Sequence, residues 1–431
     1  MRLRGFLLGI LAVIVIVILG GVALVWRPEI APISVGQESG QDKSPQDKRL
    51  VQHGAALAAI GNCNDCHVSN SGKSYAGGRS IPTPFGTIFS SNITPDGETG
   101  IGAWSEAAFQ RAMREGVDRQ GRQLYPAFPY DHFTKATSED ISALYAFLMS
   151  QTPVRNAVPA NALAFPFNFR PIVAGWKLLF FREAPLEPDD SKGEAWNRGR
   201  YLVEGLGHCG GCHTPRNVLG AEKANRTYAG GVAEGWNAPP LNSESMAAHK
   251  WTADQMAEYL STGWHRLHGA ATGPMADVTN NLGRASAQDV RAIAVYIASL
   301  SAPSGNINGS VVPPHGNQVA GASPEVVAIY SGACATCHND RHDVGPSKAI
   351  SLSLSSAVRQ SGSANAVRVM LGGIRPQSGN PGAYMPAFDG ILTDQQIASV
   401  AEYVRARYTD QSQWTDVQQQ ISKARQEGVG P

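Results

Sequence analysis

The chain has 431 residues, of which 42% are hydrophobic and 16% are charged. A chain of this length holds about three domains of ordinary size. The formal net charge is +1, and this balance gives no reason to expect nucleic acid as a partner. The charge balance is therefore uninformative, and the motifs have to indicate the function.

An uncharged apolar run, Phe6 to Trp26, lies at the start of the chain behind Arg2 and Arg4. A helix of this length spans a bilayer core of roughly 30 Å, whereas the apolar part of a secretory signal has about 7–15 residues. We therefore expect residues 1–27 to form a signal-anchor transmembrane helix, with the basic end in the cytoplasm and the rest of the chain outside. Cleavage at the Gly21-Val22-Ala23 triplet is the alternative.

The six cysteines form three C-x-x-C pairs, and a histidine directly follows each pair. C-x-x-C-H is the attachment signature of c-type haem, because the thiols bond to the haem vinyl groups and the histidine binds the iron as proximal ligand. A zinc site would need a second ligand pair nearby, and a redox dithiol would not need the histidine. We therefore predict three covalently bound haem c groups. Their ligands are the thiols of Cys63, Cys66, Cys209, Cys212, Cys334 and Cys337 and the imidazoles of His67, His213 and His338.

A helix is expected on each side of every motif. The preceding helices are predicted over residues 49–60, 196–206 and 325–331. The following helices are predicted to begin after three capping residues, Thr137, Ser286 and Thr393. Apolar residues recur in each of these helices at helical spacing. Each also has an aromatic residue at an equivalent position, which we interpret as core packing: Phe147, Tyr296 and Tyr403.

This layout predicts an all-α fold of three tandem cytochrome c domains behind one N-terminal transmembrane helix. The domains are expected at residues 48–152, 192–301 and 325–410. Residues 28–47 and 302–324 are rich in Pro, Gly, Ser, Gln and Asn, which is typical of a tether and a flexible linker. Residues 153–191 are expected to form an interdomain segment, and residues 411–431 a polar tail.

The interdomain segment contains an apolar and aromatic run, Leu163 to Phe181. One interpretation packs this run between the first and second domains. The other places it on the membrane surface or on a partner subunit. The sequence leaves both interpretations open.

A haem that only transfers electrons usually has a second axial ligand, and methionine in that position raises the reduction potential. The ligand has to come from the loop between the motif and the last helix of the domain. Met275 is the candidate in the second domain and Met385 in the third. Met246, Met256 and Met370 lie in stretches with helical patterning and are expected to be core residues.

Three stretches resemble a known family: residues 83–117, the NALAFPFNFRP segment at 161–171, and the YAGG tetrapeptide at 75–78 and 228–231. The chain resembles, from about residue 48 to residue 408, the triheme cytochrome c subunit of bacterial periplasmic dehydrogenases for alcohols, gluconate, sorbitol or aldehydes. In that family the subunit takes electrons from a catalytic subunit and hands them to ubiquinone. The resemblance implies both partners here, and it implies Met275 and Met385 as axial ligands.

The first domain departs from the family pattern. Many members have methionine in a YPAMPY stretch, whereas this chain has Phe128 there, and phenylalanine cannot bind iron. His132 follows four residues later and is predicted to replace the methionine, so that the first haem has two histidine ligands. A vacant sixth position or ligation by Met113 are the alternatives. The PAFPYDHF variant resembles cytochromes that accompany molybdenum-containing hydroxylases, such as aldehyde or N-heterocycle dehydrogenases.

These features together predict an electron-transfer subunit that is not an enzyme on its own and has no catalytic residue. Its partner would be a catalytic dehydrogenase subunit of molybdenum/iron–sulfur, PQQ or FAD type, with an aldehyde favoured over an alcohol or a sugar as substrate. The electron acceptor would be ubiquinone, a terminal oxidase or another respiratory component. The haem domains would lie on the periplasmic side of the bacterial inner membrane, where haem is attached to C-x-x-C-H motifs.

A catalytic multihaem enzyme, such as a peroxidase or a small-molecule reductase, is the alternative from another class. It requires an open iron position at the first haem and a distal acid–base group, a role that His132 would then have. The methionine candidates at the other two haems argue against it. A soluble periplasmic shuttle would require cleavage of the N-terminal helix, which the length of the apolar run disfavours.

Overall fold

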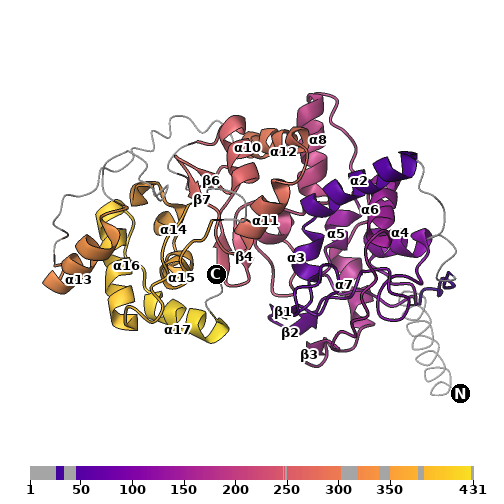
Figure 1. Cartoon of the computed structure of the whole chain (residues 1–431), viewed down its shortest axis with the longest axis horizontal. Helices are drawn as coiled ribbons and strands as arrows, with labels where there is room; N and C mark the ends of the chain where they lie inside the picture. Colours follow the sequence, from indigo (N-terminus) through magenta and orange to yellow (C-terminus); the bar gives the residue numbers. More distant parts are fainter. Residues whose placement is uncertain are drawn as a thin grey trace, which may run out of the picture. The chain divides into compact units, whose positions relative to one another are not determined.

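The computed structural model describes residues 26–33, 45–245, 247, 250–301, 319, 321–338, 350–376 and 383–428 (Figure 1). The chain divides into two compact units, Met1–Glu187 and Pro188–Pro431. The transmembrane helix expected at residues 1–27 lies, except for its last two residues, outside the described residues. Within the described ranges, no helix is both long enough and apolar enough to cross a membrane.

The first unit is a helical domain with one small sheet. Helix α2 (Pro45–Ile60) leads into the motif helix α3 (Cys63–His67), and α6 (Ser138–Met149) is the last helix of the domain. The elements between them are β1 (Ser80–Thr83), β2 (Gly86–Phe89), α4 (Glu106–Glu115) and α5 (Tyr130–Phe133). After them come β3 (Ala162–Leu163) and α7 (Ile172–Phe180). The strands pair antiparallel in the order β1-β2-β3.

A glycine allows α2 and α6 to cross in close contact. A Cβ atom on Gly54 would lie 1.9 Å from the carbonyl oxygen of Ala143 and 2.7 Å from Cβ of Phe147. Any other residue would therefore force the helices apart. The apolar positions predicted for the core of α6 are buried as expected: Ile141, Leu144, Tyr145 and Leu148.

The first part of the second unit repeats this arrangement. Helix α8 (Glu194–Glu204) leads to the motif helix α9 (Gly210–His213), and α12 (Ala287–Leu300) is the last helix. A Cβ atom on Gly199 would lie 2.0 Å from the carbonyl oxygen of Ala292, so α8 and α12 cross as closely as α2 and α6. The elements between them are η1 (Ala224–Arg226), β4 (Gly231–Ala233), β5 (Trp236–Ala238), α10 (Ala253–Thr262), β6 (Trp264–His265), β7 (Gly269–Ala270) and α11 (Pro274–Leu282).

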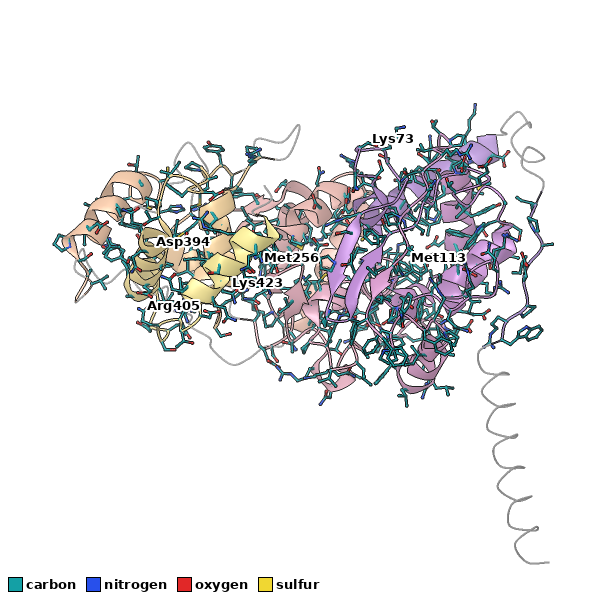
Figure 2. All side chains as sticks on the ribbon, turned by 90° about the horizontal axis from the view of Figure 1, so that it is seen from below. Lys73, Met113, Met256, Asp394, Arg405 and Lys423 are labelled. Atoms are coloured by element: carbon teal, nitrogen blue, oxygen red, sulfur yellow. The ribbon has the colours of Figure 1, made fainter. Side chains whose placement is uncertain are left out.

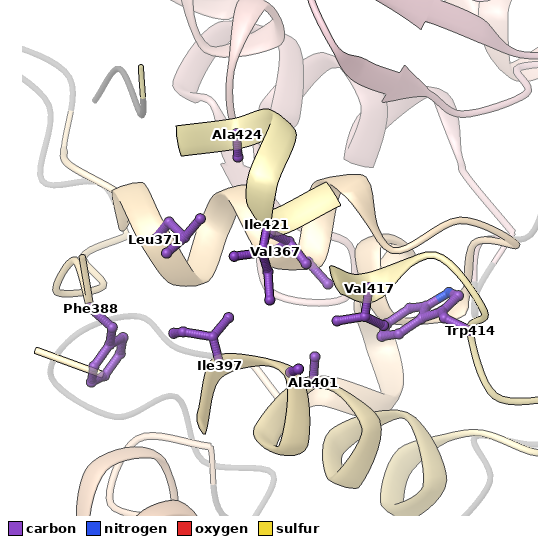
Figure 3. Packing of buried hydrophobic residues seen from close by; sticks show 11 residues of the cluster. Val367, Leu371, Phe388, Ile397, Ala401, Trp414, Val417, Ile421 and Ala424 are labelled. Atoms are coloured by element: carbon purple, nitrogen blue, oxygen red, sulfur yellow. The ribbon is translucent and has the colours of Figure 1, made fainter. Parts of the chain in front are cut away.

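The last part of the second unit is built around one central helix, α16 (Asp394–Tyr408). Its neighbours are α13 (Pro324–Ile329), the π-helical turn η2 (Tyr330–Cys334), η3 (Leu352–Leu354), α14 (Ser356–Arg359), α15 (Ala364–Gly372) and α17 (Val417–Glu427). One face of α16 packs on α15 and α17, and Figure 3 shows Ile397 and Ala401 of α16 gathered with side chains of both helices. The other face, with Val400 and Val404, packs on α13 and η2.

The predicted caps are confirmed in all three repeats. The cap hydroxyl accepts the backbone N–H three residues further on, at 3.1, 3.0 and 3.2 Å for Thr137, Ser286 and Thr393. Two of the equivalent aromatic residues, Tyr296 and Tyr403, are buried in the core as expected. Local sequence signals therefore determine where the last helix of each repeat begins.

The fold differs from the expected all-α class because three small antiparallel sheets accompany the helices in the part of the chain that the structure describes. Their strands are two to four residues long, and β1 contains Pro82. Such short strands carry no alternating pattern from which a sheet could be predicted. The all-α expectation is therefore wrong in this respect, whereas the helix-rich architecture is confirmed.

The segment that follows the first domain folds back onto it. Asn156 donates from Nδ2 to the carbonyl oxygen of Gly77 at 3.1 Å, and β3 pairs with β2. Lys177 on α7 donates from Nζ to the carbonyl oxygens of Glu115 and Gly116 at the end of α4. This segment is therefore part of the first unit.

The residues expected to form a polar tail contribute to the core. Helix α17 buries Val417, Ile421 and Ala424, and Trp414 just before it is also buried. The apolar residues lie three or four positions apart, so they share one face of the helix. The folded part of the second unit therefore extends beyond residue 410, and polar residues between these positions conceal the pattern in the sequence.

The close helix crossing makes a prediction about stability. Gly54→Ala should destabilise the first unit by at least about 1–3 kcal/mol, because the added methyl group has to displace the backbone of α6. Gly175→Ala on α7 is the matched control, since no atom lies within 4 Å of its Cβ position. That change should be neutral or stabilise the unit by about 0.5–1 kcal/mol. Denaturant unfolding followed by circular dichroism measures the free energy of unfolding of both variants. Equal values for Gly54→Ala and Gly175→Ala would contradict the close crossing of α2 and α6.

Candidate haem-attachment sites

The first C-x-x-C-H motif is a single short helix. The chain leaves α2 at Ile60, turns through Asn62 in the left-handed conformation (φ 50°) and forms α3. Cys63, Cys66 and His67 therefore all extend from about one helical turn. Thioether attachment and proximal ligation need this arrangement, because the three groups have to reach one porphyrin.

The same hydrogen bond fixes the histidine of all three motifs. The Nδ1–H group donates to a backbone carbonyl oxygen, at 2.6 Å for His67, 2.7 Å for His213 and 3.1 Å for His338. A carbonyl oxygen can only accept, so Nδ1 carries the proton and Nε2 keeps the lone pair that binds a metal. The fold therefore sets the tautomer and the orientation of each ring, as it does in metal sites with histidine ligands.

The acceptors of these hydrogen bonds are Ser91, Pro239 and Ile350. Ser91 comes shortly after β2 and Pro239 directly after β5, so in two motifs a β-hairpin brings the carbonyl to the histidine. Sequence reasoning missed these residues. The repeated YAGG tetrapeptide is the signal that could have located two of them, because it leads into both hairpins.

The tyrosine and the first glycine of the YAGG tetrapeptide have similar backbone conformations in both copies, with positive φ angles of 69° and 84° at Gly77 and Gly230. Tyr75 and Tyr228 have positive φ angles of 60° and 59°. Gly77 and Gly230 donate their N–H groups to the carbonyl oxygen of the motif histidine at 2.7 and 2.9 Å. A Cβ atom on Gly77 would lie 2.3 Å from the carbonyl group of Ser91. Glycine is therefore required where the loop lies against the acceptor of the histidine.

Burial changes the ionisation of the motif histidines in the direction that iron binding needs. It lowers the pKa of His67, His213 and His338, and the hydrogen bond to the carbonyl opposes this only in part. The ordinary pKa of histidine is already about 6.5, so these imidazoles are neutral at pH 7. A neutral imidazole is the form that binds a metal.

The thiols argue against the redox-dithiol alternative. No disulfide joins any two of the six cysteines, all of which lie in described residues. Burial raises the pKa of Cys63 and of Cys209 to about 12. A reactive dithiol needs a cysteine whose pKa is lowered, and these two motifs have the opposite environment.

The two methionine candidates lie on different kinds of element. Met275 is in the first turn of α11, after Gly273 and Pro274, and not in a loop as expected. The helix starts there because proline fits the first helical position. Met385 lies in an extended segment and exchanges two backbone hydrogen bonds with Ile374, at 2.9 and 2.8 Å. Both methionines are partly buried.

His132 lies on the short helix α5 and is only 6% exposed. It is therefore not the surface residue that a lone histidine in a loop usually is. Phe128 packs its ring on Phe133, with the centroids 5.3 Å apart. The alternative ligand Met113 is buried on the face of α4 that also buries Phe109. For each motif, the candidate for the second axial ligand thus lies on a different element from the motif histidine.

Met256 and Met370 have the positions that helical patterning predicts. Figure 2 marks Met113 in the first unit and Met256 in the second, and both side chains are 5% exposed. Met370 packs against the two apolar clusters on either side of α16. Met246 lies outside the described residues.

The donor groups of the three motifs fit haem c. Each motif offers two thiols on one turn and a neutral imidazole whose Nε2 is available for iron. The fit rests on the Nδ1 hydrogen bond, which leaves the correct nitrogen free. These groups could hold haem c covalently, and the partly buried Met275 and Met385 offer thioether sulfurs of the type that raises a haem potential.

Comparison with protein families agrees with this geometry. The cytochrome c family model matches residues 51–152. The model of cytochrome c oxidase, cbb3-type, subunit III matches residues 322–404. The first and last parts of the chain are therefore cytochrome c domains.

Relatives of known function give a more specific result. The chain is 44% identical over 419 residues to one subunit of the nicotinate dehydrogenase of Pseudomonas putida; this covers 95% of the chain but only 34% of that relative. It is 35% identical to the gluconate 2-dehydrogenase cytochrome c subunit of Pantoea cypripedii, over 88% of the chain and 90% of the relative. It is 34% identical to the cytochrome c subunit of the quinone-dependent alcohol dehydrogenase of Gluconobacter oxydans, over 92% and 86%.

The chain therefore belongs to the family of multihaem cytochrome c subunits of dehydrogenases. The family resemblance predicted from the sequence is confirmed. The chain spans about a third of the nicotinate dehydrogenase subunit. The activity of that larger protein is therefore not assigned to this chain.

The YAGG geometry makes a prediction about the first haem. Gly77→Ala should raise the midpoint potential of that haem, because the methyl group displaces the Ser91 carbonyl and an imidazole without this acceptor is a less basic ligand. Gly72→Ala is the matched control. Its φ angle is also positive, +78°, but nothing lies within 4 Å of its Cβ position. Potentiometric titration separates the two, and unaltered potentials in both variants would show that Ser91 does not tune the haem.

Proposed function

We propose that this chain is the electron-transfer subunit of a membrane-bound dehydrogenase complex of bacteria. It passes electrons from a catalytic subunit, through three covalently bound haem c groups, to ubiquinone or another respiratory acceptor. Each haem supplies a one-electron iron couple when bound. The chain contributes the cysteine thiols, the proximal histidines and the axial ligands, and it performs no substrate chemistry.

The repeated Nδ1 hydrogen bond is the observation that carries this proposal. It recurs at His67, His213 and His338 with acceptors in three different parts of the chain, which supports three haem sites rather than two. The family models match only the first and last parts of the chain. For the part between them, the close crossing of α8 and α12 at Gly199 supports a third domain of the same kind.

The catalytic partner is proposed to oxidise an N-heteroaromatic acid or an aldehyde. The higher identity to the nicotinate dehydrogenase subunit supports the first of these, so we rank nicotinate-like substrates before aldehydes. The sequence alone favours an aldehyde over an alcohol or a sugar and does not rank aldehydes against N-heterocycles. The PAFPYDHF stretch supports a partner of the molybdenum-hydroxylase type.

An N-terminal helix at residues 1–27 is proposed as the membrane anchor, with the haem domains in the periplasm. The residues that follow the apolar run are held on the first unit. Arg111 donates from Nη1 to the carbonyl oxygen of Pro28 at 2.7 Å. Arg27 pairs with Glu115 at 3.9 Å, at the same end of α4 that Lys177 binds.

The segment around helix α7 also supports a position of the first unit next to the membrane. This segment exposes apolar side chains on the first unit, which follows the N-terminal apolar run in the chain. The exposed fractions are 85, 62, 56 and 66% for Phe165, Phe169, Leu178 and Leu179. Such a large exposed apolar surface is typical of an interaction site. We therefore favour the interpretation that residues 163–181 face the membrane surface.

Purification of the intact complex tests the proposed function. Detergent-solubilised membranes should yield this chain together with a catalytic dehydrogenase subunit. Adding nicotinate to the oxidised complex should reduce the haems, whereas gluconate and ethanol should not. A ubiquinone analogue should then reoxidise them. Turnover of peroxide or another small molecule by the isolated chain, with no dehydrogenase attached, would favour the multihaem enzyme instead.

The first haem is proposed to be ligated by His67 and His132, and the others by Met275 and Met385 beside their motif histidines. Replacing methionine by the more basic imidazole favours ferric iron, so the first haem should have the lowest potential of the three. The deep burial of His132 supports its role as a ligand.

His132→Ala should therefore open the iron of one haem. That haem should become high-spin and bind carbon monoxide when reduced, while the other two keep their spectra. His53→Ala is the control in the same unit, because His53 hydrogen-bonds Asp140 at 2.6 Å and is not a proposed ligand. A low-spin His132→Ala variant with an unaltered redox titration would exclude His132 as the ligand.

A further inference from the structure

We infer that helix α15 clamps the axial ligands of the second motif, and that Arg368 is the positioning residue of this clamp. The inference rests on the proposed ligation of the second haem by His213 and Met275. It assigns a residue near the third motif to the control of the second haem.

The β4–β5 hairpin reaches both sides of the second site. Pro239, directly after β5, accepts the Nδ1–H of His213 at 2.7 Å. The indole of Trp236 lies against Gly273, where a Cβ atom would be 2.4 Å from the ring. Gly273 is the cap of α11, and Met275 is the second residue of that helix. A shift of the hairpin therefore moves the proximal hydrogen bond and the start of the methionine helix together.

The hairpin needs external support to keep this position. Its strands have three residues each, and they are joined by Glu234 and Gly235, both at positive φ (50° and 78°). This is the geometry of a tight two-residue turn. A ribbon of two short strands is marginally stable by itself in water. Its position is therefore set by the groups that bind its free edge.

Helix α15 supplies those groups. Asn365 accepts the N–H of Asn237 at 2.8 Å and donates from Nδ2 to the carbonyl oxygen of the same residue at 2.9 Å. Arg368 donates from Nε to the carbonyl oxygen of Gly235 at 3.0 Å. Its guanidinium also lies 5.9 Å from the centroid of the Trp236 ring. Arg368 thus holds both the turn of the hairpin and the indole that contacts the cap of α11.

Arg368 is itself held rigidly. The residue is 6% exposed, and its guanidinium pairs with Glu427 near the end of α17. The planar guanidinium can donate to Gly235 and to Glu427 in different directions at once, which a lysine ammonium on a flexible stem cannot reproduce. A Cβ atom on Gly235 would lie 2.3 Å from this group, so the turn fits closely against it.

Loss of the clamp should act on the second haem alone. A thioether is a neutral and weak ligand, so its bond to iron depends on where the protein holds it. In Arg368→Ala, the red absorption band of methionine-ligated ferric haem should fall by about half, because one of the two proposed methionine-ligated haems is affected. One midpoint potential should decrease and the other two should stay unchanged. Absorption spectra and potentiometric titration of the full-length protein measure both effects.

The controls separate positioning from general stability. Arg425→Ala also removes an arginine, one that pairs with Asp389 and Asp394 away from the hairpin; it should lower thermal stability at most and leave every potential unchanged. Arg368→Lys should reproduce part of the fall in the red absorption band. If the Arg368→Ala variant takes up no haem, the spectrum of Arg368→Lys tests the inference in its place.

The outcomes distinguish this inference from the proposed ligation. If the unaltered protein lacks the methionine band, the ligation itself is wrong and the clamp is wrong with it. If that band is present and both Arg368 variants keep it together with all three potentials, the ligation stands and the clamp is refuted.

Discussion

The hydrogen bond from Nδ1 of each motif histidine to a backbone carbonyl is the constraint on which the sites depend. It fixes the tautomer, so that Nε2 is available, and it holds the orientation of the ring. A carbonyl group can have this role only if the backbone is brought close to the motif. The fold achieves this in the first two repeats with a YAGG loop and a hairpin, which end near Ser91 and Pro239. The close crossings at Gly54 and Gly199 then hold together the helices that precede and follow the first two motifs.

The features that the sequence predicted are those with local signals. The three motifs, the capping hydroxyls of Thr137, Ser286 and Thr393 and the helical spacing of apolar residues each depend on residues within about four positions of one another. Such signals are read directly from the chain. They identified the proposed haem-binding residues, they located the last helix of each repeat, and the motif resemblance led to the correct family.

The features that the sequence did not predict depend on contacts between distant residues. Every residue has a carbonyl group, so nothing in the side chains of Ser91, Pro239 or Ile350 identifies them as acceptors. The strands are too short for a pattern, and α17 contributes a few apolar residues to a core that only the tertiary fold creates. The same is true of Arg368, whose partners Gly235 and Glu427 lie far from it in the chain.

The number of haems covalently bound per chain tests the central claim most directly, because each of the three histidines has the same tautomer and the same kind of acceptor. Pyridine haemochrome spectra, combined with the mass of the intact mature chain, give this number. Three haems per chain are expected, and one of them should be lost when Cys209 and Cys212 are both replaced by serine. A mature chain with two haems, whose haem content is unaffected by that double replacement, would contradict three haem sites.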